Sequence, residues 1–301
     1  MDQNGTRSTN SRSAQKAAGG RAYHALVVRV LTVAIALSAI LSAQALPKTG
    51  VIVDAVARYV AGYQQEFVAL VADEATHQRV LGSVSTAAVE RRTQGELFST
   101  ILENGIWISL HDVQVLDGRE VTDRLDVRAL LARESFGSLV RRLTEANARY
   151  NIGSVTRNFN EPTLALLLFT PAHLRDLSVD RSRVPDEPAR SSLVNLAIRL
   201  PQSASLVASR DGPVTTRATF VVESDTGRVR KTTITINAGL VDAQLDTTYQ
   251  LEPRLGIWVP VVFDERYSHR MRRGQLPYEV IEVHTTLTNY RRFETSGRIV
   301  E

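Results

Sequence analysis

The sequence predicts an α+β protein: a large, curved and mostly antiparallel sheet, an incomplete barrel, packed against a few helices. Apolar side chains recur every three or four residues from Val53 to Phe67, which predicts an amphipathic helix over 49–69. Residues 240–251 alternate between apolar and polar, the period of a half-buried strand. Helical patterns come early and strand patterns follow one another at the end. Such segregation favours α+β over a regular α/β alternation.

The N-terminal segment has the pattern of an export signal. A basic flank at 21–29 precedes the apolar run Val30–Ala43, and Ala43-Gln44-Ala45 is a small-x-small cleavage site. We expect residues 1–45 to be a leader with a disordered start and an apolar helix at 25–45, and the protein to be exported to the periplasm or beyond. The alternative is an inner-membrane anchor through residues 25–45, which would be the chain's membrane contact.

The remainder, 46–301, reads as a single α+β domain. Three strands are predicted over 67–81, 91–102 and 106–116, and Asp117-Gly118 supplies a turn. Helices are predicted over 125–132 and 136–150, where apolar residues fall on one face.

Prolines mark the next boundaries. Pro162 opens and Pro171 closes an apolar run, which predicts a short buried helix over 162–169. The polar segment 180–190 contains two prolines and many charges, which predicts an exposed linker. This linker is a possible boundary between two parts of the domain.

The C-terminal part is predicted to be strands at 219–223, 228–236, 240–251, 256–263 and 279–293. The segment 256–263 is apolar on both faces, so its outer face must be covered. Pro260 cannot donate a ladder hydrogen bond, which predicts a bulge or a sheet edge there.

Charge balance and the lack of cysteine exclude several classes of function. The chain has 36 basic and 32 acidic residues, and the basic excess lies in the leader. The remainder is electrically balanced, which gives no reason to expect nucleic-acid binding. Cysteine is absent, so disulfides, thiol catalysis and thiolate metal sites are excluded.

No catalytic or cofactor motif is found. Histidines do not occur in the spacing of a helical metal site, and we expect no metal and no cofactor. Ser109, His111 and Asp112 suggest a triad, but neighbouring residues of a strand point to opposite faces, so Asp112 would not orient His111.

Several segments resemble a family of uncharacterised exported bacterial proteins, and the match covers most of 59–293. They are Trp107–Arg124, Ala148–Asn151, Pro162–Leu166, Asp225–Val229, Leu251–Pro260, Glu265–Tyr267 and Thr288–Phe293. The strand order of that family is similar to the fold of periplasmic lipoprotein carriers (LolA/LolB-like), in which a curved sheet shelters acyl chains. The resemblance implies this fold and a lipid or acyl ligand, but no ligand residue is transferred from it.

We therefore expect an exported, non-enzymatic protein that holds an apolar ligand in its curved sheet. Large side chains expected near the hollow are Trp107, Phe220, Tyr249, Trp258 and Phe263. Alternatives are a structural or protein-interaction module with a solid core, and an unrecognised hydrolase.

A cluster of arginines is predicted to lie in a hairpin loop, where it would contact anionic headgroups or an acidic cell-envelope protein, or simply solvent. Its members are Arg266, Arg270, Arg272 and Arg273.

Overall fold

The computed structural model describes residues 46–67, 70–82, 89–101, 107–131, 133–134, 136–155, 157, 161–188, 191–207, 214–272 and 275–292. The predicted leader and its apolar helix lie outside these residues. Among those described, no helix is both long and apolar enough to cross a membrane. Residues 46–301 group into one compact unit.

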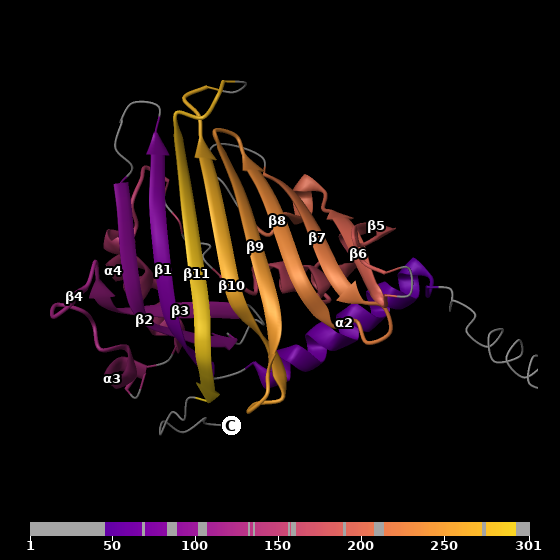
Figure 1. The fold of residues 1–301 in the computed structure, drawn as a ribbon, viewed down its shortest axis with the longest axis horizontal. Coiled ribbons are helices and arrows are strands. Elements are labelled where there is room, and N and C mark those ends of the chain that lie inside the picture. The colour runs from indigo at the N-terminus through magenta and orange to yellow at the C-terminus, as the bar shows by residue number, and fades with distance from the viewer. Residues whose placement is uncertain are drawn as a thin grey trace, which may run out of the picture. The chain divides into compact units, whose positions relative to one another are not determined.

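The predicted large antiparallel sheet is confirmed: the described residues form one open sheet of eleven strands (Figure 1). The strand order is β4-β3-β2-β1-β11-β10-β9-β8-β7-β6-β5, and every pair of neighbours is antiparallel. The strands are β1 (Leu70–Gly82), β2 (Val89–Ile101), β3 (Trp107–Leu116), β4 (Arg119–Glu120), β5 (Ser178–Arg183), β6 (Leu193–Arg199), β7 (Thr215–Glu223), β8 (Val229–Ala238), β9 (Val241–Glu252), β10 (Ile257–His269) and β11 (Glu279–Arg292).

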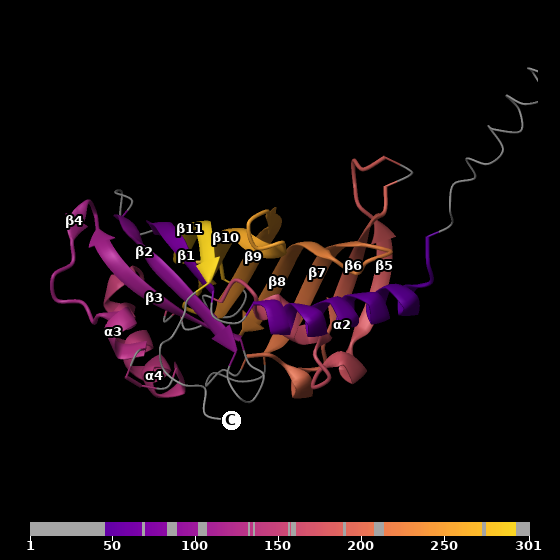
Figure 2. The same cartoon turned by 90° about the horizontal axis from the view of Figure 1, so that it is seen from below.

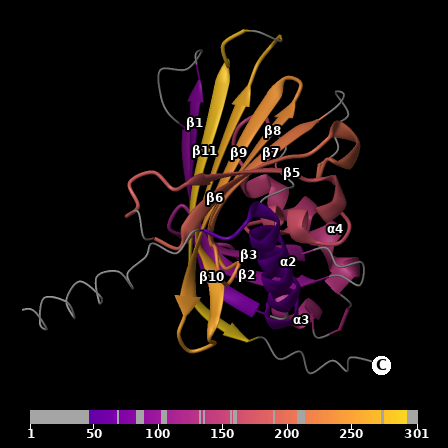
Figure 3. The same cartoon turned by 90° about the vertical axis from the view of Figure 1, so that its right-hand side faces the viewer.

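The helices lie together on one side of the broad part of the sheet (Figures 2 and 3). They are α2 (Thr49–Glu66), α3 (Val127–Leu131) and α4 (Phe136–Asn147), with the short 3-10 helices η1 (Ala148–Tyr150), η2 (Leu164–Phe169), η3 (Leu174–Asp176) and η4 (Gln202–Ala204). In Figure 2, β3 passes between the α3–α4 pair and α2. Its two faces therefore meet different helices.

The first and last strands of the sheet-forming chain are neighbours. β1 pairs with β11 along nearly its whole length, and the hydroxyls of Thr76 and Thr285 lie 3.0 Å apart across the pair. The predicted irregularity at Pro260 is confirmed as a register shift between Pro260 and Val262 in β10. The Tyr290 hydroxyl donates to the Pro260 carbonyl at 2.6 Å, so this carbonyl is satisfied within the protein.

One hydrophobic core joins α2 and η2 to the sheet. Val56, Val60, Tyr63 and Phe67 of the predicted apolar stripe are fully buried. Ile52 is buried with them, whereas Val53 is only partly buried. Phe169 of η2 packs edge-to-face on Phe220 of β7, with ring centroids 5.0 Å apart. Each large side chain buried in this way stabilises the fold by roughly 1.5–3 kcal/mol.

The turn between β7 and β8 fits closely against α2. Gly227 has φ 71°, in the left-handed region that glycine adopts without steric cost. A Cβ atom there would lie 2.2 Å from the backbone carbon of Ala55. Only glycine therefore lets this turn approach the helix backbone.

A second, smaller core lies between the α3–α4 pair and the other face of β1–β3. Val71, Phe98, Leu139 and Leu143 belong to it, and each is almost completely buried. Adjacent residues such as Leu70 and Val71 thus enter different cores, because successive side chains of a strand point to opposite faces.

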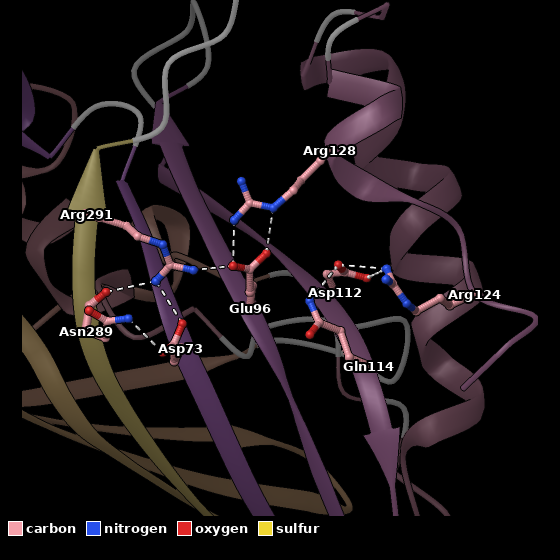
Figure 4. A network of polar contacts seen from close by, with 8 residues as sticks. All are labelled: Asp73, Glu96, Asp112, Gln114, Arg124, Arg128, Asn289 and Arg291. Carbon is pink, nitrogen blue, oxygen red and sulfur yellow. Dashed lines mark hydrogen bonds and ion pairs between the residues drawn. The ribbon is translucent and has the colours of Figure 1, made fainter. Parts of the chain in front are cut away.

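An ion network ties this second core to the centre of the sheet (Figure 4). Glu96 of β2 accepts from Arg128 of α3 at 2.9 and 2.6 Å, and also from Arg291 of β11. Arg291 donates to Asp73 of β1 at 2.8 Å. Three strands and one helix are held by these shared guanidinium groups, whose paired N–H donors match carboxylate geometry.

Three local features differ from the sequence-based prediction. Residues 180–183, the start of the linker expected over 180–190, belong to the edge strand β5, which pairs with β6 although most of its side chains are exposed. The predicted helix over 162–169 is the 3-10 helix η2. Arg266 lies within β10 rather than in a loop, because β10 continues to His269.

Candidate functional site

A cavity of about 890 Å³ lies over the central and N-terminal strands. Residues of β1, β2, β3, β10 and β11 line it, together with residues of α4, η1, η2 and the segments that follow η1 and η2. Its apolar lining includes Trp107, Ile108, Leu110, Val113, Val140, Leu143, Leu164, Leu167, Leu206, Phe263 and Val283. The volume is in the range of pockets that hold small-molecule ligands.

Helix α4 lines the cavity beside β3, whose outer edge is mostly unpaired. β4 pairs only with the last two residues of β3, Val115 and Leu116. The Asn147 side chain of α4 donates to the His111 carbonyl on β3 at 2.6 Å. This bond satisfies a carbonyl of an edge strand, and covered edges protect a sheet from unwanted pairing.

The floor of the cavity carries charged side chains from three strands. Glu74 of β1, His111 of β3 and Glu265 of β10 all line it, and both carboxylates are nearly buried. His111 donates from Nδ1 to the two carboxylate oxygens of Glu74 at 3.0 and 2.9 Å. The Tyr267 hydroxyl donates to Glu265. Buried charges need such partners, because burial without them is costly.

The surroundings shift the pKa of two of these groups. Burial alone would lower the pKa of His111, but the adjacent Glu74 carboxylate and the fields of Glu161 and Glu265 raise it above the ordinary histidine value. Burial raises the pKa of Glu265, although Arg157 and the Tyr267 hydroxyl oppose this effect. The cavity floor therefore holds protons more tightly than free side chains would.

Gln78 of β1 fastens the segment after η1 to the floor. Its side chain donates to the Tyr150 carbonyl at 3.0 Å and accepts from the Ile152 backbone at 3.2 Å. It also accepts from Arg157. Arg157 is only 6% exposed, and burial lowers its pKa. One glutamine thus places a buried guanidinium group at the cavity.

Within the described part of the chain, five atoms on cavity-lining side chains are buried and have no hydrogen-bond partner. They are Nε1 of Trp107, Nε2 of His111, Nε of Arg157, Oε2 of Glu161 and Nδ1 of His173. The other oxygen of Glu161 accepts from the backbone and hydroxyl of Thr163 at 3.1 and 2.6 Å. Buried polar atoms are nearly always paired, so these atoms are free to pair with water or with a bound molecule.

The five large side chains expected at the hollow are not brought together. Trp107 and Phe263 line the cavity. Phe220 packs on η2, and the Tyr249 hydroxyl donates to the Pro162 carbonyl at 3.1 Å, so both lie in the solid core. Trp258 alternates with the buried Ile257 and Val259 and points to the other face.

Arginines cover Trp258 on that other face. The guanidinium carbons of Arg228 and Arg230 lie 5.4 and 4.0 Å from its ring centre. Such cation–π contacts shield an aromatic ring from water. They account for how an apolar outer face on β10 is covered without a helix.

The described arginines of the predicted cluster do not share one hairpin loop. Arg266 pairs with Glu282 on β11, and Arg270 pairs with Asp242 on β9. Arg272 is exposed in the following turn, and Arg273 lies outside the described residues. Two of the four charges therefore have acidic neighbours within the sheet.

The candidate catalytic groups do not form a triad. His111 and Asp112 point to opposite faces as expected, because His111 contacts Glu74 whereas Asp112 contacts Arg124 at 2.8 Å. The Ser109 hydroxyl contacts that of Ser99 at 3.1 Å. Within the described ranges, no three histidine and acidic side chains are grouped as metal ligands.

A serine–histidine–glutamate cluster at the end of β10 and β11 has a different geometry from a triad. The Ser154 hydroxyl contacts Nδ1 of His269 at 2.8 Å and donates directly to Glu279. Glu279 also accepts from the Ser154 backbone at 2.9 Å. A triad places the imidazole between hydroxyl and carboxylate, whereas here both contact the serine, so the cluster anchors a loop.

Sequence reasoning missed the polar lining of the cavity: Glu74, Gln78, Arg157, Glu161 and Glu265. One signal was available. Glu265 lies between Phe263 and Tyr267 on the same face of a strand, and a carboxylate within an apolar face indicates a site.

Comparison with known proteins gives only structural matches. No family model matches the chain, and no curated protein matches it. Three solved structures are similar to it over most of their length. A domain described as an outer membrane lipoprotein-sorting protein from Vibrio parahaemolyticus is 8% identical, with 81% of this chain and 93% of that chain covered and a TM-score of 0.36.

The second is a DUF1329 family protein from Desulfovibrio piger, 10% identical, with 80% and 92% covered and a TM-score of 0.37. The third is a LolA superfamily protein from Nitrosomonas europaea, 12% identical, with 79% and 94% covered and a TM-score of 0.29. Likeness at this level says nothing about ligand or activity. The similar solved structures include lipoprotein-sorting and LolA superfamily proteins, the class that the sequence-based resemblance names.

Proposed function

We propose that this protein is an exported, non-enzymatic binding protein that holds one lipid-like amphiphile in the cavity over β1–β3, β10 and β11. The observation that carries the proposal is the pairing of an apolar lining with buried, unpartnered polar atoms in one cavity of about 890 Å³. Each buried methylene of an acyl chain contributes roughly 0.8 kcal/mol to binding. The polar atoms would take the head of the same molecule.

The alternative of a structural module with a solid core describes only part of the sheet. Phe169 and Phe220 fill the space over β7, and α2 packs against the neighbouring turn. The cavity lies over other strands. A hydrolase is less well supported, because no serine hydroxyl among the described residues contacts His111.

The experiment is native mass spectrometry of the protein purified from its own host, with a variant that fills the cavity. Leu206 is half-buried and lines the cavity, so Leu206→Trp should displace a co-purified lipid. Leu251 is 48% exposed on β9, away from the cavity lining, so Leu251→Trp is the matched control and should retain the lipid. Wild-type protein without bound lipid, or equal retention by both variants, would contradict the proposal.

Export is part of the same proposal. We infer that residues 1–45 are removed after Ala45 and that residues 46–301 act as one domain. The intact mass of the protein recovered from the cell envelope fraction tests this. A mass that includes residues 25–45 would instead support the inner-membrane anchor.

A further inference from the structure

We propose that the hairpin between β10 and β11 docks the protein on a membrane surface that carries anionic lipids. The name hairpin tip is used below for residues 270–272 and 275–278. The inference goes beyond the proposed function, because it concerns how the protein meets a bilayer and requires no particular ligand in the cavity.

The hairpin tip carries the two most exposed large apolar side chains of the described residues. Met271 is 74% exposed and Leu276 is 89% exposed. The Gln275 backbone N–H donates to the Arg272 carbonyl at 3.3 Å, which closes a turn between these two residues. Met271 and Leu276 come directly before and after this turn, so they stand opposite each other at one point of the surface.

A third exposed apolar side chain lies at the same end of the sheet. Val89, which begins β2, is 52% exposed. Gly82 at the end of β1 pairs with Glu279, the first residue of β11 after the tip (Figure 1). The other large apolar side chains that are exposed in the described part of the chain are Val51 on α2 and Leu251 near the far end of β9. A single exposed apolar residue needs no explanation, but a group of them marks an interaction surface.

Positive charge accompanies these apolar side chains. Residues 269–279 contain three arginines and one acidic residue. Arg272 is exposed and makes no ion pair within the described ranges. Acidic side chains at this end already have partners, in the pairs Asp242–Arg270, Glu279–Ser154 and Glu90–His77. The unbalanced charge at the tip is therefore positive, and anionic lipid headgroups attract it.

The small size of the tip favours a bilayer over a protein partner. A stable protein interface buries about 800 Å² on each partner, far more than two side chains at a turn supply. A bilayer requires less contact area, because apolar side chains enter the acyl boundary while a neighbouring arginine stays among the headgroups.

The base of the hairpin is bonded to a wall of the cavity. The Ser154 hydroxyl contacts Nδ1 of His269 at 2.8 Å and donates to Glu279. Ser154 belongs to the segment after η1, in which Asn151 and Arg157 line the cavity. Docking through the tip therefore brings this wall of the cavity towards the bilayer.

The experiment is sedimentation of the exported protein, residues 46–301, with sucrose-loaded vesicles. One vesicle population contains phosphatidylcholine and phosphatidylglycerol in equal parts, and the other contains phosphatidylcholine alone. We expect at least about tenfold tighter binding to the anionic vesicles at low salt, since each basic side chain near such a surface contributes about fivefold. High salt should remove most of this difference.

Single substitutions at the tip should weaken binding, and circular dichroism shows whether each variant remains folded. Leu276→Gln and Met271→Gln should each lower the affinity for anionic vesicles at least about fivefold, because an apolar side chain no longer enters the bilayer. Arg272→Gln should lower that affinity about fivefold and leave binding to neutral vesicles unchanged. The matched controls Leu251→Gln and Arg58→Gln replace exposed residues of β9 and α2, and they should stay within about twofold of the wild type.

Three results would overturn the proposal. The first is equal binding to the two vesicle populations, or no binding to the anionic one. The second is binding by folded tip variants as tight as that of the two controls. The third is a wild-type dimer that the tip substitutions dissociate in analytical ultracentrifugation, which would assign the tip to a second copy of the chain. Lipid retention in the cavity is measured separately, so the proposed function stands or falls on its own experiment.

Discussion

The contact between α2 and the β7–β8 turn leads to a sharp test with Gly227→Ala. Gly227 has φ 71°, and an added Cβ would lie 2.2, 2.3 and 2.4 Å from backbone atoms of Ala55 and Val56. Gly256 also has φ 71°, but nothing lies within 4 Å of its Cβ position. The pair Gly227→Ala and Gly256→Ala therefore separates the helix contact from the backbone strain that both share.

The expected magnitudes follow from these two geometries. A left-handed alanine costs roughly 1–2 kcal/mol, offset in part by about 0.4–1 kcal/mol because alanine restricts the unfolded chain. Gly256→Ala should thus lower the free energy of unfolding by about 1 kcal/mol. Gly227→Ala adds overpacking against a helix backbone, about 1–3 kcal/mol more.

Urea unfolding followed by circular dichroism measures both variants, and thermal unfolding gives a second reading. A difference of about 2 kcal/mol corresponds to a melting temperature roughly 4–8 °C lower for Gly227→Ala than for Gly256→Ala. Equal destabilisation by the two changes would refute the reasoning, because α2 would then not rest on this turn.

Three further predictions concern the core, the ion network and the cavity floor. Phe220→Ala should lower the free energy of unfolding in urea by about 3–5 kcal/mol, because Phe220 is fully buried against Phe169. The folded variant should still retain the co-purified lipid in native mass spectrometry. Loss of the lipid would instead place Phe220 at the binding site. Glu96→Gln should lower the free energy of unfolding by about 1–3 kcal/mol, because two arginines lose a charged partner. Glu90→Gln, on the exposed part of β2, is the control and should have little effect. Similar losses of stability in both variants would contradict the role of the network. Burial raises the folded-state pKa of Glu265, so the protonated side chain contributes to the free energy of unfolding at low pH. This contribution is lost as the pH rises from the ordinary glutamate range through the raised pKa. Glu265→Gln should therefore flatten this part of the stability–pH curve, measured by urea unfolding at a series of pH values. The raised pKa of His111 has the same sign at higher pH, so a decline above the histidine range should remain in that variant.

Strands with at least one apolar face were predictable, and the almost fully exposed strand β5 was not. β9 was read correctly because Ala243, Leu245 and Tyr249 point inward while their neighbours meet water. β5 shows no such alternation, since its side chains are mostly exposed and its stability comes from backbone pairing with β6. A single sequence contains little trace of a strand that buries almost nothing.

The cavity floor was beyond sequence reasoning because its members meet through strand pairing. Glu74 and Glu265 are far apart in the chain, and they become neighbours only because β11 lies between β1 and β10. Strand order is a property of the whole sheet, and local periodicity does not report it. Trp258 is the opposite case. Its apolar character is plain from the sequence, but the arginines that cover it, Arg228 just before β8 and Arg230 in β8, are brought to it by the pairing of β8, β9 and β10.

The adjacency of β1 and β11 also governs when the binding site can exist. β11 is the final described strand, 14 residues long, and it bridges the strand that carries Glu74 and the strand that carries Glu265. If the chain crosses a membrane with its N-terminus first, β1 emerges before β11 and remains unpaired on that side until β11 follows. In the proposed function, ligand binding therefore requires β11, and a fragment that lacks this strand would have no pairing between the parts of the cavity floor that β1 and β10 supply.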